Sequence, residues 1–230
     1  MKLRIRFTKV GRVRWTSHRD VARMWERALR RARVPLSYTE GFSPRPKLSF
    51  GLALPTGSES LAEYLDVSLD APVAPAPLVG ILGPLLPDGV DAVAAAVLPP
   101  GTASLQEDVS ACRWEICVPD MDHGALDRVV DRVLRAEVLS VTRERKGRVV
   151  TDDLRPSVLA LFSGPKAGGA LLVAELATRP RGVRPAELAQ VMGVTFGPVR
   201  RTHQWIERDG SRQEPLMMPA AHAAAMERAS

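Results

Sequence analysis

The sequence predicts an α+β protein made of two consecutive halves, each with the element order β-α-β-β-α-β. Residues 2–15 alternate between apolar and basic side chains as a strand does, and residues 18–34 place apolar side chains at helical spacing. Two strand-like runs, an apolar helix and another strand follow, and the pattern then repeats after a Pro/Gly linker. This order is that of two tandem ferredoxin-like units.

In the first half, the strand at residues 2–15 bends near Gly11, where we expect a hairpin or a bulge. Ser17 is the expected N-cap of the following helix, because Asp20 comes three residues later. After a proline-rich loop, we expect strands at 47–54 and 63–69, a short helix at 76–86 and a strand at 90–98.

In the second half, we expect strands at 113–118, 139–145, 158–162, 171–176 and 202–208, and helices at 124–136 and 185–192. The expected domains are therefore a basic first half at 1–100 and a second half at 101–211. Residues 212–230 are rich in Ala, Met and Pro and are expected to form a flexible tail.

Positive charge is concentrated in residues 1–51. They hold 14 Lys and Arg against 3 Asp and Glu, a net charge of +11, whereas the whole chain has 32 against 26, a net charge of +6. The remaining residues, with 18 basic and 23 acidic side chains, are net negative. A basic end of this kind predicts a polyanion-binding surface, and nucleic acid is the leading candidate ligand.

The composition argues against several other classes of function. Cys112 and Cys117 are the only cysteines and there are 4 histidines, too few for a zinc knuckle or an iron–sulfur cluster. We expect two structural thiols on opposite faces of a strand, and no metal or cofactor. No apolar run reaches the roughly 18 residues of a membrane span, and Met1 does not begin a signal peptide. We therefore expect a cytoplasmic protein without membrane contact.

The predicted helix at residues 18–34 carries an arginine stripe opposite its apolar face. At 100° per residue, the stripe falls within about 80°, and it consists of Arg19, Arg23, Arg27 and Arg30. A solvated helix face is the ordinary explanation of such a stripe, but few acidic neighbours neutralise this one. Because arginine donates paired hydrogen bonds to phosphate, we expect the stripe to bind a polyanion.

The loop at residues 38–47 interleaves aromatic and basic side chains. Tyr38 and Phe42 are its aromatic residues and Arg45 and Lys47 its cations, and Gly and Pro fix an irregular backbone. An unpaired base and its phosphate require this combination, which predicts contact with single-stranded RNA. The alternative is that the two aromatic side chains cap the core and the prolines stiffen a turn.

His18 is a candidate catalytic residue. It lies in the first turn of the basic helix, where the helix dipole and nearby arginines disfavour the imidazolium form and leave a neutral base. The more ordinary role for such a histidine is that of a surface hydrogen-bonding residue.

Several motifs closely resemble the radical-SAM-linked domain of unknown function. They are Arg4-Ile5-Arg6-Phe7-Thr8-Lys9, Ser17-His18-x-Asp20, Tyr38-x2-Gly41-Phe42-x-Pro44-x-Pro46-Lys47 and Glu63-Tyr64-x-Asp66. Members of that family occur alone or fused to cobalamin-binding radical SAM proteins, often encoded near ribonuclease E/G. The resemblance implies a stand-alone, radical-SAM-associated protein, because the sequence has no Cys-x3-Cys-x2-Cys cluster motif.

We therefore expect an accessory protein that binds RNA and presents it to a modifying or processing enzyme, with a radical SAM enzyme or ribonuclease E/G as the partner. The first alternative is a metal-independent ribonuclease that uses His18 with Tyr38 or Lys47, since tandem ferredoxin-like units resemble CRISPR repeat-processing endonucleases in architecture. The second alternative is a module whose basic face binds an acidic protein.

Overall fold

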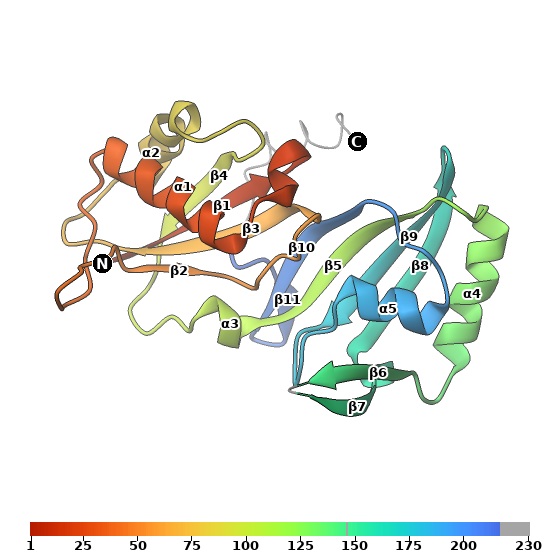
Figure 1. The fold of residues 1–230 in the computed structure, drawn as a ribbon. Coiled ribbons are helices and arrows are strands. Elements are labelled where there is room, and N and C mark those ends of the chain that lie inside the picture. Colours follow the sequence, from red (N-terminus) through yellow and green to blue (C-terminus); the bar gives the residue numbers. More distant parts are fainter. Residues whose placement is uncertain (146, 217–230) are drawn as a thin grey trace. The chain divides into compact units, whose positions relative to one another are not determined.

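The computed structural model describes residues 1–145 and 147–216 (Figure 1). Its contacts divide the chain into two compact units: Met1–Val109 with Ile206–Ser230 form unit 1, and Ser110–Trp205 form unit 2. The expected α+β class is confirmed, because helices and β-strands alternate through both units. The division differs from the predicted domains in two respects. The first boundary lies after Val109 and not after residue 100, and the chain returns to unit 1 at Ile206, so unit 1 is discontinuous in sequence.

Unit 1 has the predicted element order. Its elements are β1 (Lys2–Lys9), α1 (His18–Arg31), β2 (Leu48–Phe50), β3 (Glu59–Ser68), α2 (Pro75–Leu82) and β4 (Ala92–Val97). β1 pairs antiparallel with both β3 and β4, and β2 pairs antiparallel with β3. The strand order is therefore β4-β1-β3-β2, as in a ferredoxin-like fold, with α1 and α2 on one face of the sheet (Figure 1).

The first strand ends earlier than predicted. β1 stops at Lys9, and Gly11–Trp15 form the 3-10 helix η1 instead of the second arm of a hairpin. Gly11 begins η1 with φ at 67°, in the left-handed region that favours glycine. Ser17 is the N-cap of α1, as predicted, and its side chain accepts a hydrogen bond from the backbone N–H of Asp20.

The core of unit 1 lies between the helices and the sheet. Alternation along β1 directs Leu3, Ile5 and Phe7 toward α1, where Trp25 is fully buried. The Phe7 and Trp25 rings meet edge to face with their centres 4.9 Å apart. Burial of side chains of this size contributes about 2–3 kcal/mol each. This packing holds α1 with its polar face outward.

The two arginines of β1 are also buried, which the charge count did not reveal. Arg4 and Arg6 are each 1% exposed. Arg4 donates two hydrogen bonds to Asp66, at 2.7 and 2.8 Å, and Arg6 pairs with Glu214 and lies 5.8 Å from the ring centre of Tyr64. Burial raises the pKa of Tyr64. Two of the counted cations are thus neutralised inside unit 1 and add nothing to a basic surface.

Unit 2 repeats the fold. Its main elements are β5 (Val109–Val118), α4 (His123–Arg135), β8 (Val158–Lys166), β9 (Gly169–Ala177), α5 (Pro185–Met192) and β10 (Val199–Arg208). The strand order is β10-β5-β9-β8, again that of a ferredoxin-like sheet. Cys112 and Cys117 lie on β5, one buried and one half-buried, and neither forms a disulfide.

One predicted strand of unit 2 lies outside the main sheet. The strand expected near 139–145 is β6 (Ser140–Arg145), but it pairs with β7 (Arg148–Asp153) in a separate two-stranded sheet. This hairpin is an insertion between α4 and β8. It leaves the four-stranded order of the main sheet unchanged.

The end of the described chain is more ordered than a flexible tail. β11 (Ser211–Gln213) pairs antiparallel with β10, and Arg208 binds Asp108 at the end of the short helix α3 (Leu105–Asp108). The rest of the predicted tail, residues 217–230, lies outside the described residues. None of the helices in the described part of the chain is long and apolar enough to cross a membrane.

Candidate nucleic-acid interface

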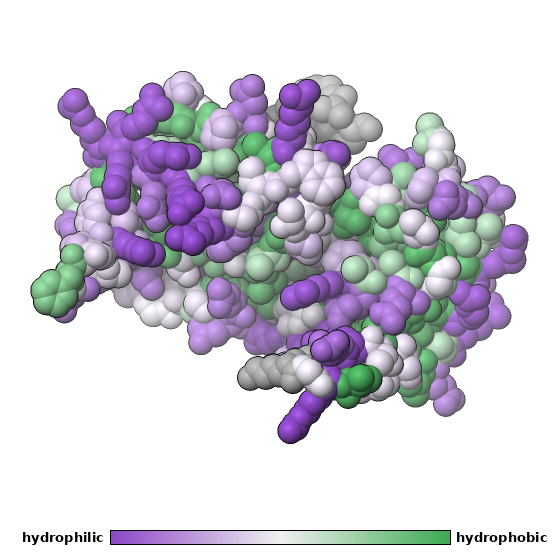
Figure 2. Space-filling model, in the orientation of Figure 1, coloured by the Kyte–Doolittle hydropathy of each residue, from purple (hydrophilic) through white to green (hydrophobic). Residues whose placement is uncertain are grey.

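The predicted arginine stripe lies on the exposed face of α1. Trp25, Ala28 and Leu29 occupy the buried face, and the four stripe residues are all exposed: Arg19, Arg23, Arg27 and Arg30. Figure 2 shows hydrophilic side chains gathered over α1. Asp20 lies 3.3 Å from Arg23, and both side chains are about half exposed, so solvent screens this ion pair and it contributes little to stability. The stripe keeps a net positive charge.

The basic surface continues past the last turn of α1 at Arg33. This residue has φ at 53°, its N–H donates to the Arg30 carbonyl, and the N–H of Val34 donates to the Leu29 carbonyl. Glycine is the usual residue at such a helix end. A side chain there costs about 1–2 kcal/mol. The sequence therefore keeps an exposed cation beside the stripe at a cost in stability.

The loop after α1 exposes both of its aromatic side chains. Tyr38 is 41% exposed and forms a β-bridge with Pro46, and the N–H of Thr39 donates to the Arg45 carbonyl at 2.9 Å. These bonds make the loop a short hairpin with Phe42 near its tip, where that side chain is fully exposed. Phe42 therefore does not cap the core.

The structure brings the loop and the stripe together at Tyr38. The guanidinium carbon of Arg30 lies 5.9 Å from the Tyr38 ring centre, within the range of a cation–π contact. Arg45 is exposed, and its backbone N–H donates to the side chain of Thr39. A basic helix face and an aromatic loop thus form one continuous surface.

Lys47 does not share that surface. It follows the loop and precedes Leu48, which packs against the core, so the alternation of the strand turns Lys47 to the sheet face away from α1. There it lines a cavity of about 560 Å³ together with Lys2 and Ser68. Of the predicted binding residues, Lys47 is the one that the fold separates from the arginine stripe.

Trp15 is an exposed aromatic residue that the sequence analysis missed. It ends η1 just before α1, is 64% exposed, and its ring centre lies 5.3 Å from the guanidinium of Arg14. The ring rests on Gly57, where a Cβ atom would come within 2.8 Å of it. Arginine–aromatic pairs therefore stand at both ends of α1. The low aromatic content of the chain was the only signal that could have drawn attention to this residue.

His18 is exposed at the start of α1 and packs edge to face against Phe50 at 5.1 Å. The cavity that it lines measures about 20 Å³, room for about one water molecule. Because a helix rises about 1.5 Å per residue, His18 lies about 18 Å along α1 from Arg30, which contacts Tyr38. The structure therefore does not bring His18 together with Tyr38 or Lys47.

Residues 2–185 match the model of a family described as an uncharacterized protein conserved in bacteria (DUF2344). The chain belongs to this family. The match begins in β1 and extends to the start of α5, so DUF2344 includes α1, the aromatic loop and most of unit 2. The family description names no activity.

Other comparisons add little to the family assignment. One similar solved structure is a chain in the crystal structure of a Cbf5-Nop10-Gar1 complex, with 13% identity and a TM-score of 0.47. The similarity covers 88% of this chain and 48% of that chain, so the DUF2344 protein spans about half of its length. At this TM-score the likeness supports no conclusion about function. Comparison with curated proteins finds no match.

Proposed function

We propose that this DUF2344 protein binds single-stranded RNA on unit 1 and presents it to a partner enzyme. The observation that carries the proposal is the exposed arginine stripe of α1 with an arginine–aromatic pair at each end. Arginine forks bind phosphate, and aromatic faces stack on unpaired bases. The rings flank the arginines, so a strand whose phosphates follow α1 has an aromatic side chain near each end on which an unpaired base can stack.

The exposed rings favour single-stranded over double-stranded RNA. Phe42 is fully exposed and Trp15 is 64% exposed, and stacking on these rings requires bases that have left a helix. In an RNA duplex the bases are stacked on each other, and proteins contact mainly the backbone and the wide minor groove. An acidic protein would neutralise the arginines, but its carboxylates would not stack on the aromatic rings.

The proposed partner is a radical SAM enzyme or ribonuclease E/G. Support comes from the sequence motifs shared with the radical-SAM-linked domain, such as Ser17-His18-x-Asp20. Because the chain has only two cysteines, the iron–sulfur cluster of any radical chemistry would have to come from the partner. A role in presenting RNA also fits the separation of His18 from Tyr38 and Lys47.

Titration of the full chain with a labelled single-stranded RNA between about 50 and 200 mM salt tests the proposal. The logarithm of the affinity should fall linearly with the logarithm of salt concentration, with a slope of about 0.7 per phosphate contact. Replacing Arg23, Arg27 and Arg30 together by Gln should lower that slope by about 2. An RNA affinity that does not depend on salt concentration, or a triple variant that binds RNA as tightly as the unchanged protein, would falsify the proposal.

A second RNA measurement separates binding from catalysis. Incubation of RNA with the purified protein and a chelator should leave the RNA intact. Cleavage that disappears in His18→Ala while affinity is retained would instead identify a metal-independent ribonuclease.

A further inference from the structure

A cavity of about 640 Å³ lies in unit 2 beside the β6–β7 hairpin and α5, and the proposed function does not use it. Its size is in the range of small-molecule sites. The side chains and backbone that line it are those of Arg143, Glu144, Arg181, Gly182, Arg184, Ala186, Glu187 and Gln190.

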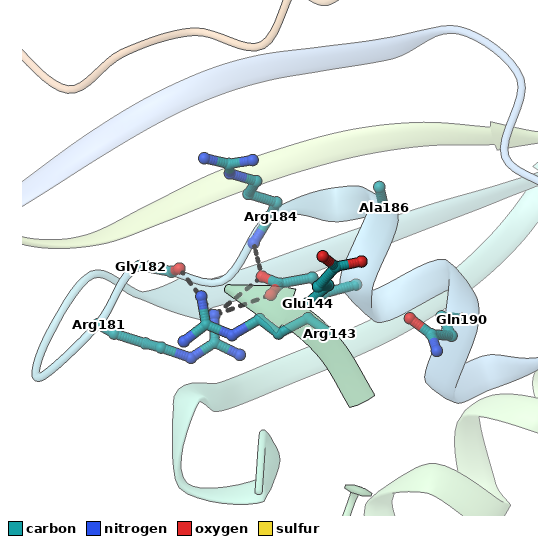
Figure 3. Close-up of a pocket in the computed structure, with 8 residues that line it drawn as sticks. Arg143, Glu144, Arg181, Gly182, Arg184, Ala186 and Gln190 are labelled. Atoms are coloured by element: carbon teal, nitrogen blue, oxygen red, sulfur yellow. Dashed lines mark hydrogen bonds and ion pairs between the residues drawn. The ribbon is translucent and has the colours of Figure 1, made fainter. Parts of the chain in front are cut away.

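Two of the lining arginines are held side by side by carboxylates. Asp152 Oδ2 accepts a hydrogen bond from Arg143 Nε at 2.8 Å and pairs with Arg181 Nε at 3.2 Å. Arg181 Nη1 also donates to both carboxylate oxygens of Glu187, at 2.9 and 3.0 Å (Figure 3). Arginines that are already fixed lose little side-chain entropy when they bind a ligand.

The Arg181 guanidinium still has donor capacity. Its Nη2 atom is buried and has no hydrogen-bond acceptor among the described residues. A buried donor without an acceptor is destabilising, and more so when it is charged. An anionic oxygen bound in the cavity would supply the missing acceptor.

The third arginine has no counter-charge. Glu187 Oε2 accepts a hydrogen bond from the backbone N–H of Arg184 at 2.9 Å, but within the described part of the chain no carboxylate pairs with its guanidinium. That guanidinium is exposed and stands apart from the other two (Figure 3). The wall also carries the polar ends of Glu144 and Gln190. The cavity thus offers guanidinium donors for an anion and neighbouring groups for hydroxyl or amine hydrogen bonds.

We propose that this cavity binds a phosphomonoester of nucleotide size. The fork of arginine matches phosphate oxygens, and Glu144 and Gln190 are placed to bind the sugar hydroxyls or base that the phosphate carries. A free nucleoside monophosphate and the 5′-phosphorylated end of an RNA chain both carry this phosphomonoester with a sugar and a base.

Calorimetric titration of the full chain with AMP, adenosine and inorganic phosphate tests the site. AMP should bind with saturation, and adenosine should bind about tenfold more weakly or less. Arg184→Gln and Arg143→Gln should each weaken AMP binding about tenfold. Arg135→Gln, an exposed arginine on α4 outside the cavity, is the control and should leave it unchanged. Arg184 is the safer variant, because its guanidinium forms no ion pair with any of the residues that the structure describes.

Competition with RNA distinguishes the two sources of phosphate. In the Arg23/Arg27/Arg30→Gln background, a 5′-phosphorylated RNA that displaces AMP better than its 5′-hydroxyl counterpart indicates an RNA end, and no difference indicates a free nucleotide. Either result supports the site. Absent AMP binding, or equal binding by the Arg184→Gln and Arg143→Gln variants, overturns it. The calorimetric titration changes no unit 1 residue of the RNA-binding surface, so its failure would leave the proposed function intact.

Discussion

The two units share a strand order but differ in what their first helices expose. On α1 the exposed charges are arginines, and Asp20 and Glu26 are half-buried, whereas α4 exposes both acids and bases: Asp127, Arg128, Asp131, Arg132 and Arg135. Asp131 pairs with Arg135 at 3.0 Å, and Asp127 accepts a hydrogen bond from Ser163. One face is self-neutralising and the other needs an external anion. The same fold therefore carries a polyanion surface in one unit only.

The sheets of the two units differ in the burial of an equivalent ion pair. Arg4 on β1 faces Asp66 on β3, and Arg113 on β5 faces Glu175 on β9, so both ion pairs join the first and third strands of a unit. The Arg4–Asp66 pair is buried and bidentate, whereas Arg113 is 39% exposed and lies 4.0 Å from Glu175. Removing one partner should therefore have unequal effects in the two units.

Asp66→Asn should give the largest loss of stability. The substitution leaves Arg4 charged and buried without its carboxylate, which costs about 3–5 kcal/mol. Glu175→Gln in the half-exposed pair should cost about 1 kcal/mol or less. Urea unfolding of both variants measures the difference, and equal losses would show that burial does not separate the two pairs.

Giving α1 the charge pattern of α4 should produce the largest loss of RNA affinity. Arg23→Asp with Arg27→Asp should weaken binding by about one to two orders of magnitude at low salt, because two phosphate contacts are replaced by repulsion. Arg128→Gln with Arg135→Gln on α4 is the matched control and should change affinity less than about twofold. Comparable losses from the two helices would contradict the assignment of the interface to α1.

Phe42→Leu should weaken binding to single-stranded RNA by about 1–3 kcal/mol without lowering the melting temperature. Phe42 is fully exposed, so its replacement removes a stacking face and no core contact. Phe162→Leu, at a 57% exposed position of unit 2, is the control and should leave RNA affinity unchanged. A lower melting temperature with intact affinity would refute stacking by Phe42.

Arg33→Gly should raise stability by about 1 kcal/mol and lower RNA affinity modestly. The left-handed position after α1 is occupied by Arg33, whereas the one after α5 is occupied by Gly193 with φ at 69°. Thermal unfolding and the salt slope of RNA binding measure the two effects. A variant that is stabilised but binds RNA as before would show that Arg33 is not part of the surface.

Ser17→Ala should raise the pKa of Asp20. The hydrogen bond from Ser17 is the main reason that this pKa lies below its usual value of 3.8, with Arg23 contributing. A carboxyl whose pKa is depressed on folding stabilises the fold above the unfolded value, and the effect is lost as pH falls below it. NMR titration should show the pKa moving toward 3.8 in the variant. Asp153, whose pKa is lowered by the backbone N–H groups of Arg155 and Leu139, should not change.

Elements with strong local signals were predictable from sequence. Helical spacing with a serine cap identified α1, and Pro185 at the first position identified α5. The β6–β7 hairpin was not predicted, because an alternating run shows a strand without showing which strand it pairs with. The stripe on α1 was predictable because residues of a helix are about 100° apart. The position of Lys47 was not, because it depends on the register of β2 with β3.

The burial of Arg4 and Arg6 could not be predicted from the sequence around them. Alternation defines two faces of a strand and does not say which one meets water. The carboxylates that accept these arginines, Asp66 and Glu214, lie 62 and 208 residues away. Charge counting along the sequence therefore overestimated the basic surface of unit 1.

The two residues of the Arg6–Glu214 pair are synthesised at widely separated times during translation. The two residues are 208 positions apart, and at about 5–20 residues per second their synthesis is separated by about 10–40 s. All of unit 2 is translated within that interval. The Arg6–Glu214 pair can therefore form only after all of unit 2 has been synthesised.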